Sequence, residues 1–272
     1  RSMTRLAEKF SHLRGKQKKA FVSFVTAGDP ELSITVPSMH ALVSGGVDVL
    51  ELGIPFSDPE AEGPSIQRSS ERALANGVRF DDVLAMVKLF REDDTETPVV
   101  LMGYLNTVLR IGYEEFSLRA AKSGVDGLIM VNLPPEEAAP LKLALTAHGI
   151  DLILLVAPTT TPNRARRIVN TASGFVYYVS LKGVTGASHL QSEAIRAKVV
   201  AVKSMTNLPV MVGFGIKDPE MASQVAAFAD GVVVGSALVD TMARLDNRVE
   251  EIPDALRVQA QSIRTALDQS ST

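Results

Sequence analysis

The chain has 272 residues, of which 46% are hydrophobic and 22% are charged, and its mean hydropathy is +0.13. This composition is typical of a globular protein with enough apolar material for one large core. The net charge of −3 and the isoelectric point of about 5.9 argue against binding to nucleic acid or to a membrane surface. The absence of cysteine excludes disulfides, thiolate catalysis and zinc–thiolate sites.

We expect neither a membrane span nor a secretory signal peptide. No apolar run reaches the roughly 18 residues of a membrane span, and the first residues lack the apolar segment of a signal peptide. We therefore expect a cytoplasmic protein. Arg1-Ser2 is interpreted as a cloning remnant before Met3, which leaves residues 3–272 as a single domain. The four histidines show no metal-ligand spacing, so no metal site is expected.

Eight short apolar runs recur along the chain, each rich in Val, Ile, Leu or Phe. Nearly continuous runs of this kind are typical of strands buried on both faces of a parallel sheet. The runs span residues 20–27, 47–53, 98–104, 127–133, 151–157, 175–181, 208–215 and 231–236.

Helical patterns precede and separate the first of these runs. A helix is expected over residues 3–14, and the basic stretch 14–19 is interpreted as a solvated loop before the first strand. Asp29-Pro30 is expected to open a helix that runs towards Gly45. The stretch 64–92 is long enough for two helices broken at Gly77.

The pattern continues to the end of the chain. Asp81 is expected to cap the segment DVLAMVKLF, which presents one apolar face. Pro135 is expected to start a helix that ends at His148-Gly149, and Asp218 is expected to start another. Eight repeats of strand and helix predict a (β/α)8 barrel with an extra N-terminal helix, rather than an open doubly wound sheet.

Four acids stand within twelve residues in the segment ELGIPFSDPEAEGPSIQ at 51–67, with no basic neighbour. Catalytic groups of such a barrel lie at the carboxyl ends of its strands. Strand alternation places Glu51 on the same face as Val49 and Gly53, towards the barrel mouth, where desolvation raises a carboxyl pKa. Asp58 and Glu62 follow in the next loop, and spacing alone does not decide which of them is the second functional acid.

Glycines gather after the last three strands. GVTG at 183–186, GFGI at 213–216 and GSA at 235–237 occupy the loops after the sixth, seventh and eighth strands. Glycine lets backbone N–H groups approach an anion, and a helix beginning near Ser236 would point its positive end at the same place. The sequence therefore predicts a phosphate site here and a phosphorylated substrate that lies across the mouth.

These residues carry a resemblance to a known family. The motifs FVTAGDP, ELGIPFSDP, GPSIQ, NLPPEE, GVTG, GFGI and GSA occur in this order, and with them the sequence from Met3 onward resembles the α subunits of tryptophan synthase. The resemblance implies a (β/α)8 barrel that cleaves indole-3-glycerol phosphate to indole and glyceraldehyde 3-phosphate. It also implies a pyridoxal-phosphate-dependent β subunit as partner in an α2β2 heterotetramer, with no cofactor in this chain.

The resemblance assigns roles to individual residues. Glu51 and Glu62 match the family's two catalytic carboxylates, and Asp58 matches a residue at the contact with the β subunit. The residues that match substrate-binding positions are Phe24, Tyr104, Tyr177 and Thr185. Those that match phosphate-binding positions are Gly186, Phe214, Gly215, Gly235 and Ser236.

The sequence departs from the family pattern at four places. Glu62 stands where the family usually has Asp, Glu60 where it has an apolar residue, and Asn132 where an Asp is common. The start of the sixth loop, Leu181-Lys182, also varies. Two other functions stay open: a Schiff-base aldolase that uses Lys182, and a regulatory subunit that binds ligand without turnover.

Overall fold

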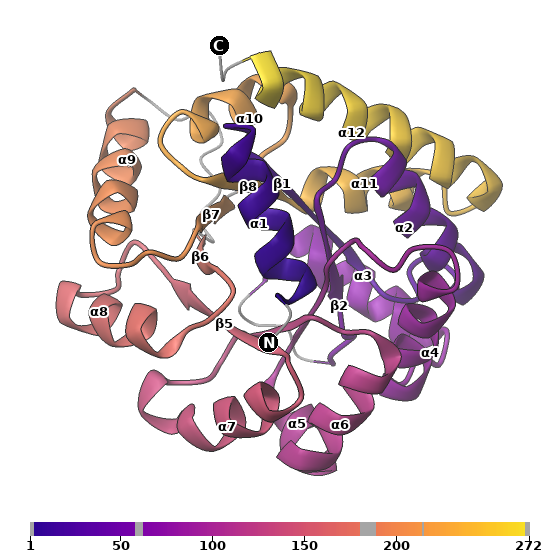
Figure 1. Cartoon of the computed structure of the whole chain (residues 1–272). Coiled ribbons are helices and arrows are strands. Elements are labelled where there is room, and N and C mark those ends of the chain that lie inside the picture. Colours follow the sequence, from indigo (N-terminus) through magenta and orange to yellow (C-terminus); the bar gives the residue numbers. More distant parts are fainter. Residues whose placement is uncertain (1–2, 58–61, 180–188, 214, 270–272) are drawn as a thin grey trace.

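The computed structural model describes residues 3–57, 62–179, 189–213 and 215–269, with the backbone alone described for 189–192. Its strands are β1 (Ala20–Thr26), β2 (Val49–Gly53), β3 (Val99–Gly103), β4 (Gly127–Met130), β5 (Asp151–Val156), β6 (Val176–Val179), β7 (Val210–Gly213) and β8 (Gly231–Val234). Each strand pairs in parallel with the next, and β8 pairs with β1. The sheet is therefore a closed barrel ringed by helices, which confirms the predicted (β/α)8 fold (Figure 1).

The helices follow the strands in the expected order. The α-helices are α1 (Arg5–Gly15), α2 (Thr35–Ser44), α3 (Pro64–Ala75), α4 (Phe80–Arg91), α5 (Leu105–Ile111), α6 (Tyr113–Ser123), α7 (Ala139–Ala147), α8 (Pro162–Thr171), α9 (His189–Lys203), α10 (Pro219–Ala226), α11 (Ser236–Arg244) and α12 (Ile252–Gln269). The 3-10 helices are η1 (Leu32–Ile34), η2 (Pro135–Glu137) and η3 (Val249–Glu251).

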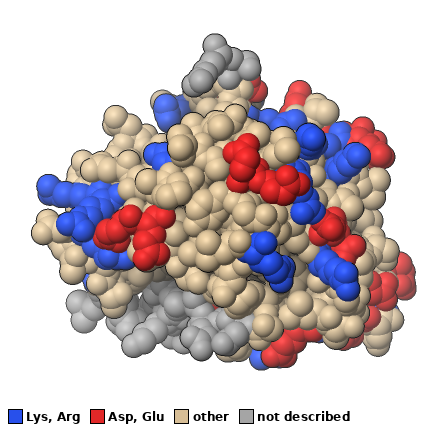
Figure 2. All heavy atoms as spheres, turned by 90° about the horizontal axis from the view of Figure 1, so that it is seen from below, with Lys and Arg blue, Asp and Glu red and all other residues tan. Residues whose placement is uncertain are grey.

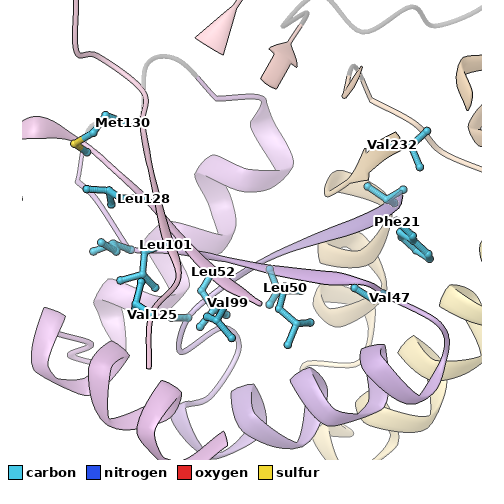
Figure 3. Packing of buried hydrophobic residues seen from close by; sticks show 14 of the residues in the cluster. Phe21, Val47, Leu50, Leu52, Val99, Leu101, Val125, Leu128, Met130 and Val232 are labelled. Atoms are coloured by element: carbon cyan, nitrogen blue, oxygen red, sulfur yellow. The ribbon is translucent and has the colours of Figure 1, made fainter. Parts of the chain in front are cut away.

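Two apolar layers form the core. The outer layer lies between the barrel and the helices and contains residues such as Leu50, Leu52 and Leu101 (Figure 3). The inner layer fills the barrel and contains residues of opposite parity on the same strands, such as Val49 and Val100. Because successive strand residues point to opposite faces, each strand contributes side chains to both layers. Both faces of a strand are therefore apolar, which explains the nearly continuous apolar runs in the sequence.

Helix α1 closes one end of the barrel. Thr4 caps it by accepting a hydrogen bond from the Ala7 N–H at 3.1 Å. Its buried residues Leu6, Phe10 and Leu13 belong to the inner layer, and the Phe10 ring meets Phe175 edge-on at 5.8 Å. Phe175 precedes β6, so α1 covers the amino ends of the strands and leaves the carboxyl ends open for chemistry (Figure 1).

Three predicted helix starts were wrong. The helix expected at Asp29-Pro30 begins only at Thr35 after η1, because the Asp29 carboxylate is bound to Arg72 and caps nothing. Asp81 is not a cap: α4 begins at Phe80, and the Asp82 carboxylate accepts from the Arg79 N–H at 2.8 Å.

The third wrong start is at Pro135. It opens a 3-10 turn, and the α-helix follows at Ala139. The break at Gly77 was correctly predicted, since this glycine has a φ of +76° between α3 and α4.

On the face shown in Figure 2, lysine and arginine side chains lie among aspartates and glutamates, so charges of both signs are mixed there. Among the helices that the structure describes, none is both long enough and apolar enough to cross a membrane.

Candidate active site

Glu51 is a buried carboxyl group inside the barrel. Its side chain is 1% exposed, and its Oε2 atom has no hydrogen-bond partner in the described part of the chain. Its neighbours Leu50 and Leu52 point outwards into the helix layer, so the predicted alternation along β2 is confirmed. Burial raises the pKa of Glu51 to about 8, and the negative charge of Glu62 adds to the effect. At neutral pH this carboxyl group therefore holds a proton.

Glu62 lies just before α3 and interacts electrostatically with Glu51. It is partly buried, and burial raises its pKa to about 7. Its backbone oxygen accepts a hydrogen bond from Gln67 Nε2 at 2.7 Å, which ties it to the first turns of α3. Two nearby carboxyl groups with separated pKa values can carry different protonation states at one pH.

Helix α3 is fixed to the barrel through buried polar contacts. The hydroxyl groups of Thr26 on β1 and Ser69 on α3 lie 2.6 Å apart, and Ser69 donates to the Ile66 carbonyl. Arg72 makes two hydrogen bonds to the Asp29 carboxylate, at 2.6 and 3.0 Å. These contacts hold the start of α3, and with it Glu62, close to the end of β1.

Tyr177 on β6 belongs to the same group of titratable residues. Burial raises its pKa well above the usual value, and the charges of Glu51 and Glu62 raise it further. Its hydroxyl group therefore stays protonated and can donate a hydrogen bond. Gly213 on β7 leaves room for it, because a Cβ atom there would lie 2.8 Å from the Tyr177 hydroxyl oxygen.

Phe24 forms a wall of the mouth beside Glu51. The two residues are register partners on β1 and β2. The Phe24 ring fills space above Gly53, whose Cβ atom would lie 2.6 Å from the ring. On its other side, a Cβ atom at Gly235 would lie 3.4 Å from Phe24 Cβ and 3.6 Å from the Ile66 side chain. Phe24 thus links the carboxyl groups to the glycine loop after β8.

The predicted phosphate site is partly described. Gly215 follows β7 with a φ of +68°, a conformation that favours glycine. Gly235 follows β8 at the start of α11, whose first residue is Ser236. Strands β7 and β8 are neighbours, so both glycines lie at the same side of the mouth. The free N–H groups at the start of α11 give this side the character of an anion site.

Tyr104 lies at the end of β3, where it precedes α5. Its ring stacks on Phe56 from the second loop, with centroids 4.5 Å apart and planes inclined by 17°. The next residue, Leu105, donates its N–H to Asn132 Oδ1 at 2.9 Å. The unusual Asn132 therefore tethers the loop after β4 to the start of α5.

Several predicted site residues lie outside the described residues, and their positions stay predictions. These are Asp58, Thr185, Gly186 and Phe214, together with Glu60 and Lys182, which entered the alternative interpretations.

The structure adds residues that the motif reasoning missed. Met102 on β3 and Leu155 on β5 are partly buried and pack against the inner layer, as Tyr177 does. Both have the inward parity of their strands, so alternation along β3 and β5 would have found them. Ile66 on α3 has no such signal, because only the fold brings α3 next to Gly235.

Metal ligands do not cluster in the part of the chain that the structure describes: it contains no group of three or more His, Asp or Glu side chains able to hold an ion.

Comparisons with known proteins agree with the geometry. A sequence model of the tryptophan synthase alpha chain family matches residues 10–268. The tryptophan synthase alpha chain of Nitrosococcus oceani is 52% identical over 266 residues, which cover 98% of each chain. That of Thioalkalivibrio sulfidiphilus is 55% identical over 241 residues, covering 89% of this chain and 91% of the relative.

Solved structures show the same similarity. The crystal structure of tryptophan synthase subunit alpha from Legionella pneumophila superposes with a TM-score of 0.92 at 46% identity, covering 98% of this chain and 100% of that one. A chain in the aminoacrylate-bound tryptophan synthase of Mycobacterium tuberculosis superposes with a TM-score of 0.86 at 36% identity, covering 97% and 99%.

Proposed function

The chain belongs to the tryptophan synthase alpha chain family, and we propose that Glu51 and Glu62 carry out its lyase reaction, the cleavage of indole-3-glycerol phosphate to indole and glyceraldehyde 3-phosphate. The observation that carries these roles is the buried Glu51 carboxyl group, protonated near neutral pH, beside the more acidic Glu62.

The reaction is a retro-aldol cleavage and needs two proton movements. Carbon 3 of the indole ring gains a proton, and the hydroxyl group of the glycerol chain loses one as the carbon–carbon bond breaks. Neutral Glu51 donates the first proton and, once ionised, accepts the second, so it ends the cycle as it began. Its apolar surroundings favour the neutral form before the reaction.

Glu62 stabilises the ring nitrogen in this mechanism. The nitrogen becomes electron-poor when carbon 3 is protonated, and a carboxylate next to its N–H stabilises that charge. The lower pKa of Glu62 makes it the better of the two acids for the ionised role. The Tyr177 hydroxyl group, which stays protonated, supplies a hydrogen bond to the substrate.

The remaining residues bind the two ends of the substrate. The apolar side chains of Phe24, Met102 and Leu155 suit the indole ring. Phe24 is the register partner of Glu51, and Leu155 is the register partner of Tyr177. We propose that Gly215, Gly235 and Ser236 bind the phosphate, together with Gly186 and Phe214, which lie outside the described residues. Tyr104 and Thr185 are proposed to contact the substrate.

We propose that the chain works with a tryptophan synthase β subunit in an α2β2 heterotetramer in the cytoplasm. Asp58 is the proposed contact, and pyridoxal phosphate is proposed to reside in the partner, with no cofactor in this chain. Indole is small and apolar and is easily lost to solvent, so direct transfer to a partner retains it.

Indole release from indole-3-glycerol phosphate, measured with and without a β subunit, tests the activity and the partnership. We expect slow cleavage by the isolated chain and faster cleavage in the complex. Equal rates in both preparations would contradict the partnership, and a complete lack of indole release in the complex would leave only the regulatory alternative. Borohydride treatment with substrate tests the aldolase alternative, since a covalent adduct at Lys182 would contradict the acid–base mechanism.

A further inference from the structure

A second cavity lies at the end of the barrel opposite the active-site mouth. It has a volume of about 720 Å³ and lies between the end of α1, the starts of β1 and β7, and the turn after α9. Helix α1 borders it, at the barrel end that faces the viewer in Figure 1. The lining residues are Phe10, Leu13, Arg14, Gln17, Lys18, Lys19, Ala20, Lys203, Thr206, Asn207, Leu208, Pro209 and Asp230.

The basic stretch 14–19 was expected to be a solvated loop, and residues 14–18 are indeed exposed, but the stretch also includes the end of α1 and lines the cavity. Arg14 belongs to the last turn of α1, and Lys19 is only partly exposed, with its ammonium group 2.9 Å from the Ala229 carbonyl oxygen. The stretch forms one wall of the cavity.

Positive charge dominates the cavity. Its lining contains four cationic side chains and a single carboxylate, Asp230, although the chain as a whole has a net charge of −3. Outside the lining, Asp268 pairs with one of the four, Lys18, at 3.9 Å. Asp230 is shared, because Lys203 lies 3.4 Å from its Oδ1 atom while the Val210 N–H binds Oδ2 at 2.8 Å. Burial lowers the pKa of Lys19, and the positive charge of Lys203 lowers it further. The Asp230 carboxylate acts in the opposite direction and raises the pKa of Lys19, so it offsets part of the repulsion between the two lysines.

The rim of the cavity contains a strained residue. Gln17 has a φ of +55°, the only positive value among the described residues other than glycine. It occupies the position after the end of α1 where the chain turns left-handed, with the Lys18 N–H bound to the Leu13 carbonyl at 2.9 Å and the Gln17 N–H to Arg14 at 3.1 Å. Glycine is the favoured residue at this position of a helix end. The strained glutamine places a carboxamide on the cavity wall at a cost in stability, and such strain is typical of functional positions.

We propose that this cavity binds a small organic phosphate with an apolar substituent. The excess of cationic groups matches the double negative charge of a phosphate monoester, and the Arg14 guanidinium group can bind two phosphate oxygens at once. The carboxamides of Gln17 and Asn207 provide neutral donors. Phe10, Leu13, Leu208 and Pro209 form the apolar part of the lining against which the substituent packs.

This site is distinct from the proposed substrate site. Gln17 and Asn207 lie at the amino ends of the strands, whereas Gly235 and Ser236 follow the carboxyl end of β8. A bound phosphate at the amino ends therefore leaves the catalytic mouth free. Loss of binding at one site should leave binding at the other unchanged, so the inference and the proposed function fail separately.

Titration of the ¹⁵N-labelled chain with phenyl phosphate tests the proposal. We expect saturable shifts of the backbone amide signals of Gln17, Lys18 and Asn207, independent of any shift at Gly235. The double variant Arg14→Ala/Lys203→Gln should weaken binding at these amides by about tenfold or more. Indole release in the complex with the β subunit should not change, since neither residue lies at the mouth.

A charge-matched control separates a built site from general attraction. Arg164→Ala/Arg167→Ala removes two exposed cations of α8, which both pair with Glu136, and should leave phenyl phosphate binding unchanged. An equal loss in this control, or shifts that do not saturate, would show non-specific attraction only and overturn the proposal. Wild-type affinity in a folded Arg14→Ala/Lys203→Gln variant would overturn it as well.

Gln17 gives an independent test. Gln17→Gly should raise Tm, because it relieves the left-handed strain, and should weaken binding, because it removes the carboxamide. Gln17→Asn keeps a carboxamide and tolerates the same backbone conformation, so it should retain more binding than Gln17→Gly. If Gln17 only shapes the end of α1, Gln17→Gly should raise Tm and leave binding unchanged. That result would show that Gln17 does not contact the bound phosphate.

Discussion

The ring of Phe24 occupies space that exists only because residue 53 is glycine. A Cβ atom at Gly53 would lie 2.6 Å from Phe24 Cζ, closer than two carbon atoms can approach. Phe24 is also the register partner of Glu51. Any side chain at position 53 would therefore displace the Phe24 ring, which forms the wall of the mouth next to the proposed acid, Glu51.

We expect Gly53→Ala to disturb the mouth without reaching the carboxyl groups. The added methyl group must displace the Phe24 ring, and overpacking of this kind costs about 1–3 kcal/mol of stability. KM for indole-3-glycerol phosphate should rise, because the ring would no longer form a wall of the indole pocket. Steady-state kinetics with the β subunit and thermal unfolding check both effects. An unchanged KM would show that Phe24 does not contact the indole ring.

Phosphate binding should depend on the two described glycines. Gly215→Ala forces a non-glycine residue into a left-handed conformation at a cost of about 1–2 kcal/mol, and Gly235→Val crowds both Phe24 and Ile66. Both variants should raise KM sharply and weaken competition by inorganic phosphate. As a control, Gly149→Ala has the same kind of backbone strain at the end of α7 and should lower stability alone. Unchanged KM in both site variants would place the phosphate elsewhere.

Glu62 should be necessary for turnover, and a shorter carboxylate should replace it. Glu62→Ala should nearly abolish indole release, while Glu62→Asp should retain it, because Asp keeps the negative charge next to the ring nitrogen. Glu71→Ala, which removes an exposed acid from α3, provides the control and should be mild. An active Glu62→Ala variant would remove Glu62 from the mechanism. Glu60→Leu should also lower indole release only slightly. If Glu60→Leu were inactive while Glu62→Ala stayed active, Glu60 and not Glu62 would be the second functional acid.

The two raised pKa values predict the pH dependence of activity. Glu62 must be ionised and Glu51 protonated at the start of the reaction. With pKa values of about 7 for Glu62 and about 8 for Glu51, kcat/KM should rise through about pH 7 and fall above about pH 8. A profile without the fall at high pH would show that the essential acid is not Glu51.

Stability should depend on pH in the direction that a raised carboxyl pKa requires. Folded Glu51 keeps its proton up to about pH 8, whereas the unfolded chain releases it near pH 4.5. The folded state thus binds more protons between these values, and stability falls as pH rises through this range, by an amount on the order of a few kcal/mol. Glu51→Gln removes this dependence. Its advantage over the wild type in denaturant unfolding should grow from about pH 4.5 to pH 8, and a constant difference would contradict the burial of a titrating Glu51.

The sequence predicted the barrel well because its strands carry a local signal. Continuous apolar runs and the parity of Glu51 against Leu50 and Leu52 required no knowledge of distant contacts. Helix starts were less predictable. Asp29 could not be recognised as a partner of Arg72, since 43 positions separate the two residues and only the fold brings them together.

The sequence singled out candidate site residues where a motif or strand alternation marks them. It did not reveal those that only the packing of the folded chain brings to the site. Glu51 and Glu62 followed from the resemblance and from strand parity, but the raised pKa of Glu62 depends on burial that only the folded chain shows. Ile66 reaches the mouth through α3, which is fixed by the hydrogen bond between Thr26 and Ser69. The cationic cavity was hidden as well, because its members Arg14, Lys203 and Asp230 are distant in sequence.

Glu51 is the proposed proton donor, and the variant Glu51→Gln removes its ability to transfer a proton. Glutamine keeps the shape of the side chain and can still form hydrogen bonds, but it cannot transfer a proton. The loss of one general acid–base group lowers the rate by roughly 10²–10⁴. KM should change little, since the phosphate and ring contacts come from other residues. The decisive measurement is kcat for indole release by Glu51→Gln in complex with the β subunit. We expect a kcat about a hundredth of wild type or lower. A variant that retains more than about a tenth of wild-type kcat would show that Glu51 is not the proton donor.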